Sequence, residues 1–210
     1  MDFYTGEHAA EQVAEPKEPK KQNKESFKVS FFDWIDVVAT SVIVVVLIFT
    51  FFFRVVTIDG DSMLDTLISG QKVVITNVAY TPKQGDIVVI SRNTDNSLDP
   101  TEYSTPIIKR VIAVAGQTVD IDHEQGIVYV DGVALKEPYT KTPTTARIED
   151  EIDFPVYIPD NCIFVMGDNR NWSLDSRSER IGKNGMIDTR HVLGKAVYRI
   201  FPLKEMGGLY

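Results

Sequence analysis

The feature that most constrains this chain is an uninterrupted apolar run near its N-terminus. Residues 37–53 read VVATSVIVVVLIFTFFF without a charged side chain, and four more apolar residues lie just before them, namely Phe31, Phe32, Trp34 and Ile35. The segment reaches the roughly 20 residues that an α-helix needs to cross a hydrocarbon core of about 30 Å. We therefore expect a transmembrane helix over residues 31–54, with a buried core helix or strand as the alternative.

The residues around the run indicate an uncleaved signal anchor with a defined orientation. The run is longer than the hydrophobic region of a cleaved signal peptide, and the following RVVTIDGDS lacks a small-x-small cleavage site. Lysines concentrate before the run, so the positive-inside rule predicts a cytoplasmic N-terminus and an extracytoplasmic remainder. These lysines are Lys17, Lys20, Lys21, Lys24 and Lys28, whereas only Arg54 and Lys72 follow closely.

Composition divides the chain into three expected parts. Residues 1–30 are rich in Glu, Lys, Gln and Pro and hold few apolar residues, which predicts a disordered cytoplasmic tail. Residues 31–54 form the signal anchor. Residues 55–210 are then expected to form one extracytoplasmic domain.

The part after residue 54 has the pattern of a mainly β, antiparallel fold. Short β-type runs alternate with Gly, Asp, Asn and Pro clusters, and Asp131-Gly132 predicts a tight hairpin turn. Polar loops are expected at residues 92–106 and from Lys141 onward, and no helix of three turns is expected. The predicted strands are VVTI, KVVITNV, DIVVIS, PIIKRVIAV, TVDI, GIVYV, CIFVM and AVYRIF.

Charge and rare residues exclude several classes of function. A formal net charge of -8 has the wrong sign for a nucleic-acid-binding protein. The single cysteine, Cys162, cannot form an intrachain disulfide and is expected to be a buried core residue. The three histidines, His8, His123 and His191, do not have the spacing of metal ligands, so no metal or cofactor is expected.

Two residue types far apart in the sequence suggest nucleophilic chemistry. Ser62 lies in GDSMLDTL, just after the apolar run, where it is either a nucleophile or an ordinary turn serine. Lys109 lies in the apolar strand PIIKRVIAV, where alternation places it with Ile107, Val111 and Ala113. A lysine in such a place either extends to the sheet edge or loses its charge and becomes a general base for a serine.

A third polar stretch, MGDNRNWSLDSR at residues 166–177, follows a predicted buried strand. Its opposed charges and hydroxyl groups are suited to holding one another in place. A calcium loop is the competing interpretation, because Asp168, Asn169 and Asp175 offer oxygen ligands. The spacing departs from the EF-hand pattern, and the arginines oppose a cation.

With these stretches identified, the chain resembles the bacterial type I signal peptidases, in particular their Gram-positive branch. GDSMLDTL is similar to the nucleophile motif, QGDIVV to the strand after it, IIKRVIAVAGQTV to the lysine motif and GDNRNWSLDSR to the last signature. All four occur in the family order behind an anchor. The resemblance implies the signal-peptidase β fold with a reduced second domain after Val114.

The resemblance also implies the catalytic residues. It assigns Ser62 as the nucleophile and Lys109 as the general base, with the backbone N–H of Ser62 in the oxyanion hole. Gly60 stands where some relatives have a serine that adds a second oxyanion donor.

Four further residues are implied to support the site. Ser173 matches the serine that orients the lysine by a hydrogen bond. Asp175 and Arg177 match a supporting ion pair, and Met63 resembles a residue that lines the substrate groove.

The implied activity is removal of N-terminal signal peptides from exported preproteins after small-x-small sites, with preproteins and membrane lipid as partners. The position of Ser62 independently supports an activity at the membrane, because the chain from Phe53 to Ser62 spans at most about 30 Å. The nucleophile must therefore act near the membrane surface.

Asp65 is the one conspicuous departure from the family pattern, which usually has proline there. Proline would restrict the loop that carries Ser62, whereas a carboxylate close to Lys109 would favour the charged ammonium. This departure leaves open a catalytically silent or weakened homologue that binds exported segments. The alternative among enzymes is another Ser/Lys regulatory protease.

Overall fold

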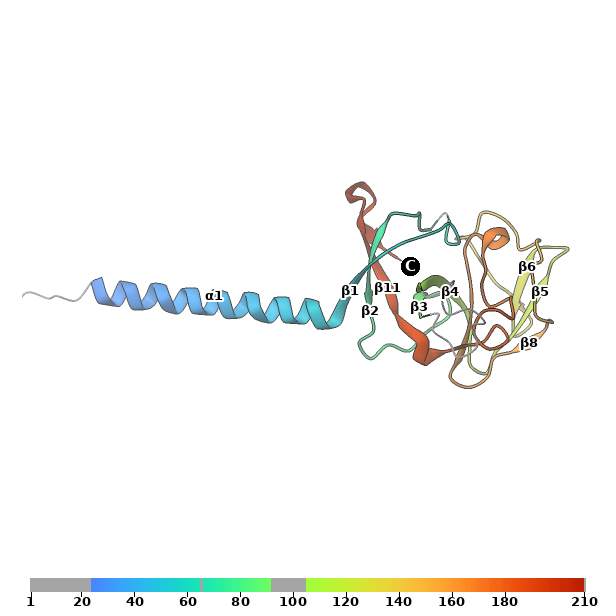
Figure 1. The fold of residues 1–210 in the computed structure, drawn as a ribbon, viewed down its shortest axis with the longest axis horizontal. Helices are drawn as coiled ribbons and strands as arrows, with labels where there is room; N and C mark the ends of the chain where they lie inside the picture. The colour runs from blue at the N-terminus through green and yellow to red at the C-terminus, as the bar shows by residue number, and fades with distance from the viewer. Residues whose placement is uncertain (1–23, 65, 92–104, 210) are drawn as a thin grey trace, which may run out of the picture. The chain divides into compact units, whose positions relative to one another are not determined.

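The computed structural model describes residues 24–64, 66–91 and 105–209, with side chains from residue 31 onward. The chain divides into two units, Met1–Val46 and Leu47–Tyr210. Figure 1 shows the course of the chain and labels its elements.

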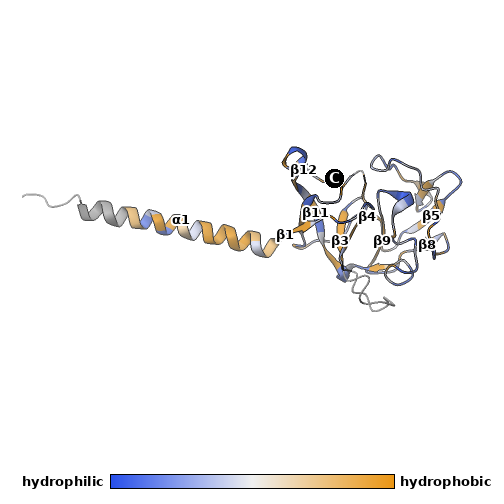
Figure 2. Cartoon of the chain, turned by 45° about the horizontal axis from the view of Figure 1, so that its top comes forward, coloured by the Kyte–Doolittle hydropathy of each residue, from blue (hydrophilic) through white to orange (hydrophobic). Residues whose placement is uncertain are grey.

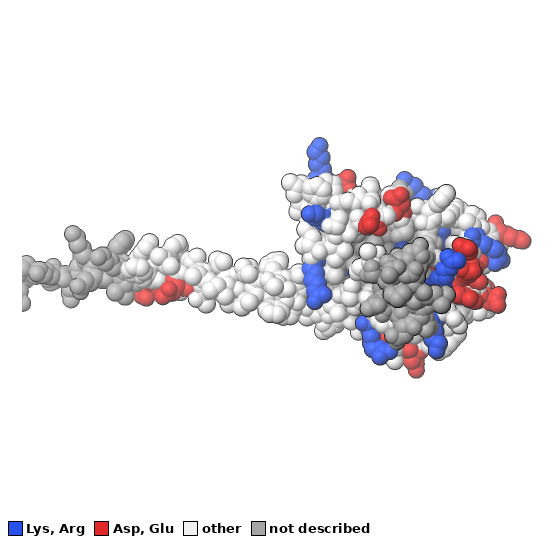
Figure 3. All heavy atoms as spheres, in the orientation of Figure 1, with Lys and Arg blue, Asp and Glu red and all other residues white. Residues whose placement is uncertain are grey.

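The apolar run forms a helix, α1 (Lys24–Phe52). The 22 residues Phe31–Phe52 are long and apolar enough to cross a membrane, with a hydropathy of 2.6, and none of their side chains is buried. Figure 2 shows the hydrophobic colouring along this stretch, and in Figure 3 the acidic atoms of the helix lie only toward its N-terminal end. The hydroxyl group of Ser41 donates to the carbonyl of Val37 at 2.7 Å, which satisfies one polar group on an otherwise apolar surface. The exposure of residues 31–52 is what a transmembrane helix requires.

The larger sheet is antiparallel and has the strand order β1-β2-β11-β3-β4-β9-β10, with β12 paired to β11. Each longer predicted run after the helix is found as a strand of this sheet or of the smaller one. The strands of the larger sheet are β1 (Phe53–Thr57), β2 (Lys72–Thr76), β3 (Ile87–Ile90), β4 (Ile107–Val114), β9 (Cys162–Met166), β10 (Ile187–Asp188), β11 (Val192–Phe201) and β12 (Gly207–Gly208).

The smaller sheet is the reduced second domain expected after Val114. Its order is β7-β6-β5-β8, from β5 (Thr118–Asp122), β6 (Ile127–Val130), β7 (Val133–Ala134) and β8 (Val156–Tyr157). The predicted hairpin is confirmed, because Asp131 and Gly132 have φ values of 53° and 76° and connect β6 to β7. Such positive φ values at both central positions are typical of a primed turn.

Short helical turns are the only helices in the described residues after Phe52. They are η1 (Arg170–Trp172), η2 (Thr189–His191) and η3 (Leu203–Glu205). Most of the predicted polar loop at 92–106 lies outside the described residues. Cys162 is half-buried, and its side chain packs against a core cluster.

Strand β4 connects the three core clusters of the protein. Ile108, Val111 and Ile112 each belong to a different cluster. The simple alternation predicted for this strand is wrong beyond Val111, because a β-bulge shifts the register there and Ala113 packs with Ile112. The bulge lies after Lys109, so the strand around the lysine stays regular and well fixed.

Candidate active site

Ser62 and Lys109 lie together in the folded chain. Lys109 Nζ donates a hydrogen bond of 2.6 Å to Ser62 Oγ. Lys109 lies on the central strand β4 and is only 3% exposed, whereas Ser62 is half-buried in the connection between β1 and β2. A serine hydroxyl is thus in direct contact with an amine that has lost nearly all of its solvent.

The loop that carries Ser62 is fixed at its base by backbone hydrogen bonds. Ile58 N donates to the carbonyl of Gln71 at 2.8 Å, and Leu67 N donates to the carbonyl of Met63 at 2.8 Å. Gly60 has a φ of 89°, a left-handed conformation that glycine adopts without strain. Asp65 lies outside the described residues.

Met63 is buried, although the resemblance implies that it lines the substrate groove. Its side chain has no exposed surface and packs in a core cluster with Leu67, Val73 and Ile75. The structure therefore places Met63 beneath the loop, where it holds Ser62 from the core side, and not on an accessible substrate groove.

The loop after β9 holds Ser62 from the opposite side. Asn169 donates twice to the Ser62 loop, from its backbone N to the Ser62 carbonyl and from Nδ2 to the Asp61 carbonyl, both at 3.0 Å. Gly167 is packed so closely that an added Cβ would collide with the Ser62 carbonyl oxygen and the Ser173 hydroxyl group. Only glycine fits between these two serines.

Ser173 is close to this site but lacks its expected hydrogen bond. Its side chain is 5% exposed, and Oγ makes no hydrogen bond of good geometry, although the hydroxyl group lies close enough to Asp175 to help lower the pKa of that carboxyl group. Lys109 donates to Ser62, and the expected hydrogen bond from Lys109 to Ser173 is absent from the structure.

Asp175 and Arg177 form the predicted ion pair. Arg177 Nε lies 2.8 Å from Asp175 Oδ1, and both side chains are fully buried. Burial favours the neutral carboxyl group, but the charge of Arg177 outweighs it and holds the pKa of Asp175 below its ordinary value. Asp175 also accepts a hydrogen bond of 3.0 Å from the backbone N of Gly167, so the pair supports the glycine that contacts Ser62.

A second buried ion pair, which the sequence patterns did not single out, joins the lysine strand to the same loop. Arg110 donates to both carboxylate oxygens of Asp168, at 2.8 and 2.7 Å, and Thr66 Oγ1 donates to Asp168 at 2.5 Å. The sequence feature that could have predicted this ion pair was an arginine beside Lys109 in an otherwise apolar strand. Because Asp168 binds Arg110 and Asp175 binds Arg177, the carboxylates of the suggested calcium loop are already paired with arginines.

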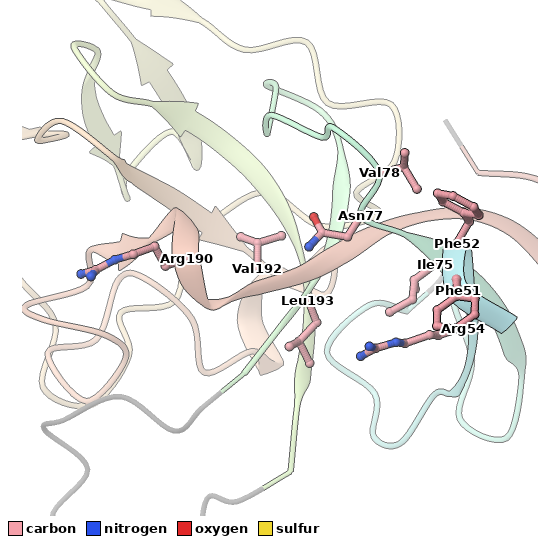
Figure 4. Close-up of a pocket in the computed structure, with 9 residues that line it drawn as sticks. All are labelled: Phe51, Phe52, Arg54, Ile75, Asn77, Val78, Arg190, Val192 and Leu193. Atoms are coloured by element: carbon pink, nitrogen blue, oxygen red, sulfur yellow. The ribbon is translucent and has the colours of Figure 1, made fainter. Parts of the chain in front are cut away.

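A cavity of about 430 Å³ lies apart from these residues, and Figure 4 shows its lining side chains. Neither Ser62 nor Lys109 contributes to its lining. The cavity is lined by Phe51, Phe52, Arg54, Ile75, Asn77, Val78, Arg190, Val192 and Leu193.

Within the described residues, no group of three or more His, Cys, Asp or Glu side chains is placed to hold a metal ion. The groups that the structure brings together at the site are the Ser62 hydroxyl group and the Lys109 amine.

Comparisons with known proteins show what the chain as a whole is similar to. The family model described as signal peptidase, peptidase S26, matches residues 31–201. The chain is 37% identical over 155 residues to the probable signal peptidase I-1 of Synechocystis, covering 72% of this chain and 73% of that one. It is 32% identical over 195 residues to signal peptidase I S of Bacillus subtilis, covering 89% and 97%. A solved signal peptidase I from Enterococcus faecalis is 25% identical, with a TM-score of 0.40, and covers 55% of this chain and 97% of that one.

Proposed function

The chain belongs to the signal peptidase family, peptidase S26, and on that premise we propose that Ser62 and Lys109 carry out its removal of signal peptides. The 2.6 Å hydrogen bond between Lys109 Nζ and Ser62 Oγ is the observation that carries the proposal. It has the length expected when a base is positioned to take the proton of a nucleophile.

The proposed reaction begins with a neutral Lys109. Burial disfavours the ammonium form, so the amine can accept the proton of Ser62 as Oγ attacks the scissile carbonyl. The resulting lysine ammonium then donates a proton to the leaving amine, which releases the mature protein. Water hydrolyses the acyl-enzyme in the second half of the reaction, with Lys109 again as the base.

The oxyanion is proposed to be stabilised by the backbone N–H of Ser62. This group makes no hydrogen bond to any other described residue, so it is available to a developing negative charge. Gly60 provides no hydroxyl donor, and its left-handed backbone shapes the turn that presents the N–H group.

Three residues are proposed to support the pair. Asp175 and Arg177 fix Gly167, which in turn contacts the Ser62 carbonyl. The Ser173 hydroxyl, buried beside Gly167 without a partner, is available to accept a hydrogen bond from Lys109 once the lysine has left the serine.

We also propose that residues 31–54 anchor the enzyme in a membrane, with residues 1–30 in the cytoplasm and residues 55–210 outside. The exposed apolar helix supports the anchor, and membrane lipid is then a partner. The cavity near the end of the helix fits this view, since Arg54, which lines it together with the apolar Phe51 and Phe52, is a residue type that can extend its charge to a membrane interface. Protease protection in sealed vesicles tests the orientation, because an extracytoplasmic domain must be digested from outside.

The test of the catalytic proposal is cleavage of a preprotein with an Ala-x-Ala site by the full chain in detergent. Mass spectrometry of the new N-terminus should show cleavage after the second small residue, and Ser62→Ala should abolish it while keeping the fold. Absence of cleavage by folded wild-type protein, over a range of pH and precursors, would favour a catalytically silent homologue.

A further inference from the structure

The segment that follows β7 reaches from the smaller sheet toward the Ser62–Lys109 pair. We propose that Glu137 and Tyr139 of this segment are positioning residues, which hold the two halves of the catalytic pair through Arg170 and Arg110. The inference rests on the proposed function of Ser62 and Lys109, and neither Glu137 nor Tyr139 belongs to the motifs that identify the family.

Glu137 is bound to a fully buried arginine. Its two carboxylate oxygens accept from Arg170 Nη2 and Nη1 at 2.5 and 2.6 Å, and the exposed side-chain fractions are 11% for Glu137 and 0% for Arg170. This two-point geometry fixes the guanidinium group in direction as well as in distance. Removing the carboxylate would leave Arg170 buried without its main counter-charge.

Arg170 transmits this constraint to the residue that contacts Ser62. Its Nε donates to the carbonyl of Gly167 at 3.0 Å, and Nη1 donates to Thr144 Oγ1 at 3.1 Å. Gly167 lies in close contact with the carbonyl of Ser62. A change in the position of Arg170 therefore moves the backbone against which the nucleophile rests.

Tyr139 makes the corresponding contact on the side of the lysine strand. The guanidinium carbon of Arg110 lies 3.9 Å from the centre of the Tyr139 ring, within the range of a cation–π interaction. Arg110 is the neighbour of Lys109 on β4, is 1% exposed and binds Asp168 through two hydrogen bonds. Tyr139 thus covers the face of the buried arginine that follows the general base.

Glu137 and Tyr139 are also linked to each other, so the segment acts as one unit. The Tyr139 hydroxyl group donates to Glu137 at 3.2 Å, and the same ring lies 5.9 Å from the guanidinium carbon of Arg170. One short segment therefore contacts the arginine behind the nucleophile and the arginine beside the base. A displacement of about 1 Å between reacting groups costs on the order of 100-fold in rate, so this support has a measurable effect on catalysis.

The test compares Glu137→Gln and Tyr139→Leu with wild type, as full chains in detergent. We expect kcat for preprotein cleavage to fall by about 10- to 100-fold, with KM changed less than about twofold, because neither side chain contacts the substrate-attacking atoms. Amide hydrogen exchange, which does not depend on activity, should become faster in peptides covering 58–64 and 167–173. Tyr139→Phe keeps the ring and should retain most of the activity.

Two matched control variants change exposed residues of the smaller sheet. Glu124→Gln changes an exposed acid between β5 and β6, and Tyr157→Leu changes a tyrosine on β8 that is 60% exposed. Both should behave as wild type. If Glu137→Gln fails to fold, Tyr139→Leu carries the test, because it leaves both arginine ion pairs in place.

The outcomes separate this inference from the proposed function. Folded variants with wild-type kcat and wild-type exchange would overturn the positioning role while the function stands. Uniformly faster exchange over the whole domain, with kcat unchanged once it is corrected for the folded fraction, would also overturn it, because a smaller folded fraction lowers the apparent kcat and leaves KM unchanged. If wild type cleaves no preprotein but the variants still exchange faster around Ser62, the proposed function fails and the positioning role holds.

Discussion

Lys109 Nζ lies 2.6 Å from Ser62 Oγ, although the two residues are 47 positions apart in the sequence. The contact joins the connection that follows β1, an edge strand of the larger sheet, to β4, which lies inside the sheet between β3 and β9. Hydrogen bonds from Asn169 and the close packing of Gly167 hold the serine loop in this position.

Lys109→Arg should abolish cleavage while keeping a positive charge at the site. Arginine is always protonated in proteins, so it cannot accept the proton of Ser62. We expect the rate of preprotein cleavage to fall at least about 1,000-fold, measured by mass spectrometry of the mature N-terminus. Lys109→Met, an uncharged residue of similar length, should be equally inactive and well folded. Appreciable turnover by either variant would exclude Lys109 as the base.

Gly167→Ala should damage both folding and activity. The added methyl group would overlap the Ser62 carbonyl oxygen and the Ser173 hydroxyl group, so the two loops must separate. We expect a loss of about 1–3 kcal/mol in the free energy of unfolding and a fall of at least tenfold in kcat. Gly207→Ala is the control, since an added Cβ there meets nothing within 4 Å. Equal behaviour of the two variants would contradict the tight fit at Gly167.

Asp168→Asn should be strongly destabilising because it leaves Arg110 buried beside a neutral partner. Removing the charge of one partner in a buried ion pair lowers the free energy of unfolding by about 3–5 kcal/mol, which denaturant titration can measure. The matched control is Asp188→Asn, because Asp188 pairs with Arg190, whose side chain is 84% exposed. Exposed pairs contribute about 0–1 kcal/mol. Arg110 also donates to the Gly85 carbonyl at 2.8 Å, and a small effect at Asp168 would show that this bond is sufficient to hold the buried guanidinium group.

Asp175 should make the protein sensitive to acid. Because Arg177 lowers the pKa of Asp175 in the folded chain, the unfolded chain binds the proton first. The stabilising contribution is therefore complete above the ordinary value of 3.8 and is lost as the pH falls below it. Denaturant titrations from pH 7 to pH 2 should show that the free energy of unfolding falls less steeply with acid in Asp175→Asn than in wild type, although this variant is less stable at neutral pH. Asp160→Asn, at an exposed position, is the control. The same decrease with acid in all three proteins would contradict the prediction.

Asp65→Pro should restore the usual family residue three positions after the nucleophile. We expect a somewhat higher cleavage rate because proline restricts the loop, and a pH optimum at lower pH if the carboxylate approaches Lys109, where it would favour the lysine ammonium. Full pH–rate profiles of both proteins provide the comparison. Indistinguishable rates and profiles would remove any functional role for Asp65.

The strands and the apolar helix could be predicted because their signals are local. Runs such as KVVIT and CIFVM specify strands through residue type and alternation, and Asp131-Gly132 specifies a turn through its backbone freedom. The two-residue strands β8 and β10 were not predicted, since such short pairings depend on the partner strand more than on their own residues. The bulge after Val111 was missed for the same reason.

The residue types and their order already specify the chemistry available to this protein: a serine behind an apolar anchor, a lysine in an apolar strand and a loop of opposed charges, in an order that resembles one family. How these groups meet depends on the tertiary structure. It brought Ser62 to Lys109, left the Ser173 hydroxyl without a partner, buried Met63 and joined Glu137 to Arg170. Local residue preferences act over a few positions, whereas these contacts depend on the packing of strands distant in the chain, which no local pattern records.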